Sequence, residues 1–171
     1  MEKLSARLVA LIAVLSALGN ILGYLGIRLP SAPGTTVEFH LSALPSLLLA
    51  FSVGPMSGAI TGFLSVIMAT MRIGNVFIPF GNALLAGIAG LIAHKLKFSP
   101  PVSGALAMVP YAPYIWAACL VYNVPPAVIA FIIVKAFIEV LISGTIIELI
   151  LRRHEVRNFL EGFKPKVQAT S

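Results

Sequence analysis

The run AFIIVKAFIEVLISGTIIEL, residues 130–149, is long and apolar enough to cross a lipid bilayer, yet it contains three charged side chains, Lys135, Glu139 and Glu148. A charge at the centre of a bilayer costs at least a few kcal/mol, so charges within a membrane face protein, water or a ligand. The run therefore predicts a membrane helix whose charged side chains have partners.

The composition of the whole chain points to an integral membrane protein. Of its 171 residues 58% are hydrophobic and 11% are charged, and the mean hydropathy is +0.98. A soluble domain is about half apolar and about a quarter charged. Since a spanning helix needs roughly 20 apolar residues, there is room for about six spans and for no separate soluble domain. We predict one all-α membrane domain over residues 1–171, built as a six-helix bundle.

Proline, glycine and charged residues divide the chain into candidate spans. These cover residues 4–25, 41–53, 55–71, 76–94, 101–122 and 125–152, and a basic tail occupies 153–171. The second span is short and contains Pro45, which predicts either a kink or a helix embedded among neighbours that supply partners for its backbone.

Most basic residues fall on one side of this topology. They are Lys3, Arg7, Lys95, Lys97, Arg152, Arg153, Arg157, Lys164 and Lys166. Only Arg28 and Arg72 lie on the other side, so the positive-inside rule places both termini in the cytoplasm. Topology thus accounts for the net charge of +6. The tail is expected to touch anionic lipid or a partner, and no nucleic acid is expected to bind.

Small residues occupy two faces of the first span. One face carries Ala6, Ala10, Ala13 and Ala17, and nearly opposite lie Ser16, Gly19, Gly23 and Gly26. Small residues let membrane helices approach closely, so this helix can pack on two sides. Either both faces serve the chain's own bundle, or one of them binds another protein.

These features together resemble an energy-coupling-factor (ECF) transporter S component, a small membrane subunit that captures vitamins or their precursors for prokaryotic uptake. The resemblance rests on chain length, the spans, the AxxxA repeats and two segments, LSALPSLLLAFSVGPMSGAITGFLS (41–65) and PFGNALLAGIAGLIAHKL (79–96). It implies six helices, cytoplasmic termini, a location in the cell membrane and an outward-facing pocket. No substrate-specific signature is recognised.

The resemblance also implies partners. The first helix is expected to dock on a transmembrane coupling subunit that works with two ATPases, and the S component topples in the membrane to release its cargo. The docking motif matches either Ala6 with Ala10 or Ala13 with Ala17. In the family, the first outer loop and the outer parts of helices 4, 5 and 6 line the ligand site.

Lys135 and Glu139 are the most distinctive candidates for that site. Their i, i+4 spacing places them on one helix face, near mid-membrane, and allows an ion pair. They either neutralise each other as part of the architecture or line the pocket floor, where one partner meets a polar or ionised substrate. Glu148 lies near the inner surface and is expected to contact Arg152.

Other polar and aromatic side chains are expected in the outer half, and they provide the remaining ligand-site candidates. They are Glu38 and His40 in the loop RLPSAPGTTVEFH (28–40), Asn75, Asn82 and Asn123, and the tyrosines Tyr111 and Tyr114. The loop is either a lid or a solvated connection. The tyrosines, with Tyr122 on the same face, could sandwich a flat heterocycle. Trp116 is interpreted as an interface or packing residue, and Arg72 lies at a loop edge, where snorkelling alone would explain it.

The sequence carries no recognised catalytic motif. It lacks a G-x-x-x-x-G-K-[ST] phosphate loop, so ATP is expected to be used only by partner subunits and no cofactor is expected in this chain. It also lacks G-x-S-x-G and H-E-x-x-H, and its scattered histidines predict no metal site. A ligand-capturing subunit is thus favoured over a scaffold, a self-contained carrier or an intramembrane enzyme.

Overall fold

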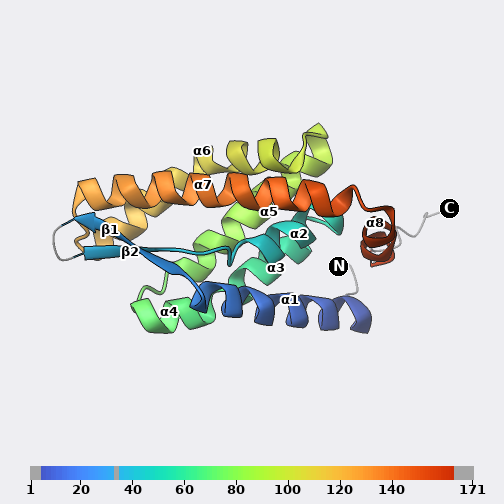
Figure 1. Cartoon of the computed structure of the whole chain (residues 1–171), viewed down its shortest axis with the longest axis horizontal. Helices are drawn as coiled ribbons and strands as arrows, with labels where there is room; N and C mark the ends of the chain where they lie inside the picture. The colour runs from blue at the N-terminus through green and yellow to red at the C-terminus, as the bar shows by residue number, and fades with distance from the viewer. Residues whose placement is uncertain (1–4, 33–34, 164–171) are drawn as a thin grey trace.

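The computed structural model describes residues 5–32 and 35–163 (Figure 1). Within these ranges the elements are α1 (Ala6–Tyr24), β1 (Ile27–Ala32), β2 (Thr35–Phe39), α2 (Leu44–Ser52), α3 (Pro55–Leu64), α4 (Ile67–Ile73), α5 (Ile78–Leu96), α6 (Pro100–Val121), α7 (Pro126–Leu151) and α8 (His154–Glu161). The prediction of an all-α protein is therefore wrong in one respect, because the first outer loop forms a β-hairpin.

The short helix α2 lies at the centre of the bundle. It packs against α1, α3, α5 and α7, while α5 packs against α3 and α6, and α6 packs against α7. The fully buried side chains Leu47, Ile129 and Ile147 belong to the core around it. The start of α1 and helix α8 lie at one end of the bundle, and the hairpin lies at the other (Figure 1).

The outer surface of the bundle suits lipid. Four stretches are long and apolar enough to cross a membrane: α1, the α3–α4 stretch, α6 and α7. Large apolar side chains on this surface are open, with Val14 65%, Val109 71% and Val134 59% exposed. Soluble proteins rarely expose apolar surface on this scale. The 9 residues of α2 are too few to cross a membrane alone. Helix α5 is long enough, but the polar side chains Asn82 and His94 and the charged Lys95 interrupt its apolar sequence.

The single helix expected over residues 55–71 is broken into α3 and α4. The break is held open by a side chain from another helix, Asn20 of α1. Its Nδ2 donates to the carbonyl of Leu64 at 2.8 Å, and its Oδ1 accepts from the backbone N–H of Met68 at 2.8 Å. One amide therefore satisfies an acceptor and a donor that the interrupted helix leaves free.

Two other sequence expectations are refined. Pro45 lies in the first turn of α2, where a missing N–H removes no helical hydrogen bond, so it begins the helix and the helix is embedded. Part of the expected tail forms α8, which buries Leu160 at the end of the bundle and leaves Phe159 60% exposed. The rest of the tail, residues 164–171, lies outside the described residues, as does Lys3.

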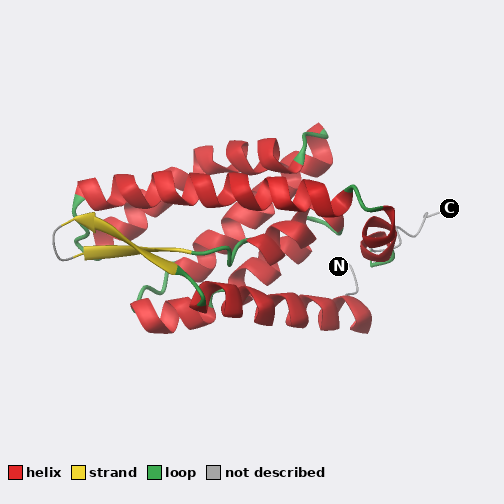
Figure 2. Ribbon diagram, in the orientation of Figure 1, coloured by secondary structure: helices red, strands yellow, loops and turns green. Residues whose placement is uncertain are grey.

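The hairpin pairs β1 and β2 antiparallel and lies beside the helices at one end of the bundle (Figure 2). The run TTVEF favours an extended chain because its residues are largely β-branched or aromatic. Arg28 faces Glu38 across the strands, and their side chains form an ion pair at 3.4 Å. Both strands contact α7. After β2 the chain runs through residues 40–43 into the bundle and reaches α2, which brings His40 and Ser42 inside.

Candidate functional site

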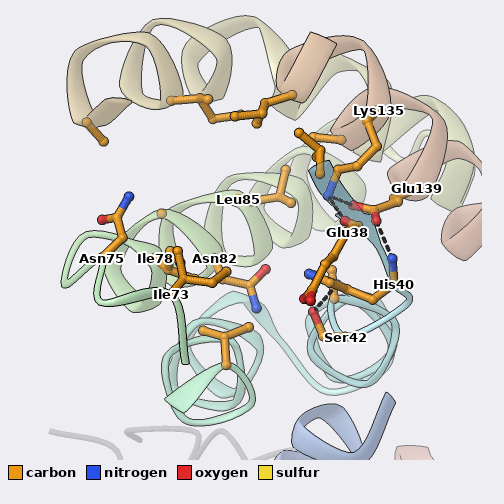
Figure 3. Close-up of a pocket in the computed structure, with 18 of the residues that line it drawn as sticks. Glu38, His40, Ser42, Ile73, Asn75, Ile78, Asn82, Leu85, Lys135 and Glu139 are labelled. Atoms are coloured by element: carbon orange, nitrogen blue, oxygen red, sulfur yellow. Dashed lines mark hydrogen bonds and ion pairs between the residues drawn. The ribbon is translucent and has the colours of Figure 1, made fainter. Parts of the chain in front are cut away.

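A cavity of about 480 Å³ lies between α4, α5, α6, α7 and the hairpin segment, by which we mean the hairpin together with residues 40–43 that follow it (Figure 3). A volume of this size holds a small organic molecule. Much of the wall is apolar and comes from α5, α6 and α7. These helices contribute Ile78, Leu85, Ile115, Ala118, Ile132 and Val140. Polar groups enter this wall at a few points, which is the usual form of a small-molecule site.

The cavity brings together all but one of the side chains that the sequence predicts for a ligand site. Those lining it are Glu38, His40, Asn75, Asn82, Tyr111, Tyr114, Lys135 and Glu139. Asn123 is instead exposed in the turn between α6 and α7, with a φ of 52° that asparagine tolerates better than most residues. It does not line the cavity.

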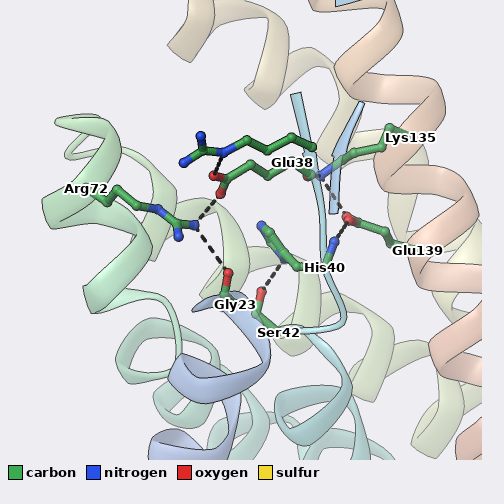
Figure 4. Close-up of polar contacts among 8 residues, drawn as sticks. Gly23, Glu38, His40, Ser42, Arg72, Lys135 and Glu139 are labelled. Carbon is green, nitrogen blue, oxygen red and sulfur yellow. Dashed lines mark hydrogen bonds and ion pairs between the residues drawn. The ribbon is translucent and has the colours of Figure 1, made fainter. Parts of the chain in front are cut away.

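Lys135 and Glu139 form an ion pair at 2.9 Å, with side chains only 11% and 9% exposed. They also hold the backbone near the end of β2 and just after it (Figure 4). Lys135 Nζ donates to the carbonyl oxygen of Glu38 at 3.0 Å, and Glu139 Oε1 accepts from the backbone N–H of His40. Extended backbone inside a membrane protein needs such partners. The pair is thus both architectural and part of the cavity wall, so the two interpretations of the sequence are compatible.

The Glu38 side chain joins the hairpin to the opposite wall. Its carboxylate pairs with Arg72 of α4 as well as with Arg28, and Arg72 also donates to the carbonyl of Gly23 in α1 at 3.2 Å (Figure 4). Arg72 is therefore more than a loop-edge residue. Its ion pair with Glu38 joins two residues that are 34 positions apart in the sequence, and no local sequence pattern indicates such a contact.

Asn82 is fixed by the backbone of α3. Its Nδ2 donates to the carbonyl of Gly62 at 3.0 Å and to Ser65 Oγ at 3.2 Å. The approach requires a glycine, because a Cβ on Gly62 would lie 2.7 Å from the carbonyl oxygen of Asn82. With both donors pointing toward α3, the amide oxygen turns toward the cavity (Figure 3).

The tyrosines of α6 pack on each other and on α5. Tyr111 and Tyr114 have ring centroids 6.2 Å apart and planes at 16°. A ring held between them needs about 7 Å, twice a contact distance of roughly 3.5 Å, so these two rings do not sandwich a ligand in this conformation. A Cβ on Gly81 would meet Tyr114 at 2.7 Å, so Gly81 makes room for the rings. Tyr122 packs edge-on against Phe77 outside the cavity wall.

His40 lines the cavity from the segment between β2 and α2. Its Nδ1 lies 2.9 Å from Ser42 Oγ. Each nitrogen of a neutral imidazole either donates or accepts a hydrogen bond, depending on the tautomer.

The two small-residue faces of α1 have different surroundings. Gly19 and Gly23 are buried, where Gly19 packs against Ser65 and Gly23 packs against Ser42. The four alanines of the other face, Ala6, Ala10, Ala13 and Ala17, are all exposed. The bundle thus uses one face of α1 and leaves the alanine face open along its length.

Comparison with known proteins identifies the fold. No family model matches the sequence, and no curated protein is similar to it. Among solved structures, the S component of a bacterial ECF transporter matches with a TM-score of 0.67 and 22% identity over 91% of this chain and 98% of the other. The chain therefore has the fold of an ECF transporter S component.

Proposed function

We propose that this protein is the substrate-binding membrane subunit of an ECF-type uptake transporter in a prokaryotic cell membrane. It captures a small molecule, such as a vitamin or vitamin precursor, from outside and relies on a coupling subunit and two ATPases for transport. The observation that carries this proposal is the cavity at the hairpin end, which is lined by polar groups from four separate helices and the hairpin segment.

The orientation proposed for this subunit follows from its charges. Basic side chains gather at the end that contains α8, including Lys95, Lys97, Arg152 and Arg157, and this end would face the cytoplasm. The hairpin end and the cavity would then face outward. In this arrangement α3 and α4 together make one crossing, and α2 with the extended segment before it makes another, which gives six crossings in all.

The ligand can be identified by mass spectrometry of small molecules released from gently purified protein. We expect a bound molecule with the wild type and none with Ala136→Trp, which fills the cavity from α7. The matched control is Ala130→Trp, an exposed position on the same helix. Equal recovery from both variants would contradict the assignment of the cavity. Co-purification with an ATPase complex distinguishes this function from that of a scaffold.

The isolated chain is expected to bind its ligand without ATP and to accumulate none. The reason is that its sequence contains no phosphate-binding loop, so the energy must come from partner subunits. Liposomes containing the chain alone should show binding but no uptake against a gradient, and added coupling and ATPase subunits should restore uptake. Accumulation by the chain alone would favour a self-contained carrier.

A further inference from the structure

The charged side chains that line the cavity are already paired with one another. Lys135 pairs with Glu139, and both are nearly buried. Arg72 pairs with Glu38, with 31% and 16% of their side chains exposed. Arg28 also lines the cavity but is 71% exposed, so water screens its charge. Among the described lining residues, the enclosed positive and negative charges therefore cancel.

Several neutral polar groups at the cavity have unused hydrogen-bonding capacity. Asn82 uses both amide protons on α3, which leaves its Oδ1 as an acceptor. Asn75 accepts from the backbone N–H of Phe77 at 2.9 Å with its Oδ1, which leaves its Nδ2 as a donor. The hydroxyl of Tyr111 donates to no group within residues 5–32 and 35–163. These groups offer both donors and acceptors, and none of them carries a charge.

A charged ligand would disturb this balance. Transfer of an ion from water into an enclosed site is costly unless a counter-charge receives it, and here each enclosed counter-charge has a partner. An uncharged ligand meets no such penalty, since amide and hydroxyl groups can replace its hydrogen bonds to water. The apolar walls then bind the rest of the molecule.

We infer that the ligand of this cavity is a molecule without net charge, with an apolar body and both hydrogen-bond donors and acceptors. The inference rests on the proposed function, because it concerns the same site. It narrows that function, since small micronutrients include acids, bases and neutral molecules, and only the last group fits.

Three probes that share one ring system test the inference: indole-3-acetamide, indole-3-acetate and tryptamine, which are neutral, anionic and cationic at neutral pH. Calorimetry on the purified protein in detergent measures their affinities. We expect the amide to bind at least about tenfold more tightly than either ion, because an unpaired enclosed charge costs more than 1.4 kcal/mol. An acid or amine that binds as tightly as the amide would overturn the inference.

Variants that release one enclosed charge make the test sharper. Glu38→Gln leaves Arg72 without its carboxylate and should shift the preference toward indole-3-acetate. Lys135→Met leaves Glu139 unpaired and should shift it toward tryptamine. The matched control is Glu148→Gln, whose ion pair with Arg152 lies on α7 away from this cavity. A control that shifts the preference as much as Glu38→Gln contradicts the argument from paired charges.

The molecule released from the native protein gives an independent outcome. A neutral molecule supports the inference even if the indole probes bind too weakly to measure. A molecule with a net charge at neutral pH overturns the inference and leaves the proposed capture function intact. If no molecule is released and no probe binds, the proposed function fails, and the inference fails with it.

Discussion

Two bulky substitutions on the alanine face of α1 are expected to abolish substrate uptake while ligand binding survives. Ala13→Trp combined with Ala17→Trp places two large rings on a face that the bundle leaves exposed. The chain itself should therefore fold normally, but a partner helix can no longer approach closely. Uptake by the complete transporter should fall at least about tenfold, since each ring overfills a close-packed contact.

Measurement of the second alanine pair shows which of the two candidate motifs docks on the coupling subunit. The double variant of Ala6 and Ala10 should be measured beside the first, together with ligand affinity in detergent for both. Leu18→Trp, which is also exposed on α1 but lies away from the alanine face, serves as the control and should transport normally. Normal uptake by both double variants would show that α1 is not the docking helix.

Removal of one partner of the Lys135 and Glu139 pair is expected to cause the largest loss of stability. Lys135→Met leaves a nearly buried carboxylate without its cation, and such losses cost about 3–5 kcal/mol. It also removes the donor to the Glu38 carbonyl. Thermal unfolding in detergent and calorimetry of ligand binding should both show the effect. A more exposed pair at the end of the same helix, Glu148 with Arg152, provides the control, and its loss should cost less than about 1 kcal/mol.

The double variant Lys135→Met with Glu139→Gln separates stability from binding. It leaves no lone charge, and the glutamine oxygen can still accept from His40, so most of the stability should return. The Glu38 carbonyl near the end of β2 keeps no lysine donor, so this part of the chain retains only one of its two hydrogen bonds to α7 and ligand affinity should stay low. Wild-type affinity in a stable double variant would show that the pair serves the architecture alone.

The long helices could be predicted from the sequence because each is an apolar run that ends at proline or charge. The span expected over 125–152 is the helix Pro126–Leu151, and the one over 101–122 is Pro100–Val121. The break between α3 and α4 could not be predicted, because residues 64–68 contain no glycine or proline and the cause is Asn20 on another helix. Local sequence does not encode that contact.

The site was predictable where charge or polarity conflicts with a membrane helix, as at Asn82, Lys135 and Glu139. A polar group in such a place needs a partner, so its presence already indicates a site. The hairpin was harder to predict. Its strands are short and β1 contains Pro30, and one of their contacts with the bundle comes from Lys135, about a hundred residues further along the chain.

The side chains of Lys135 and Glu139 in α7 contact only main-chain atoms of residues 38 and 40, near the end of β2 and just after it. Every amino acid has a carbonyl oxygen to offer at position 38, and every amino acid except proline has an N–H to offer at position 40. Substitutions at these two positions can therefore change the side chains that line the cavity while both hydrogen bonds to α7 remain. The side chains offered to a ligand and the attachment of this part of the chain to α7 can thus vary independently.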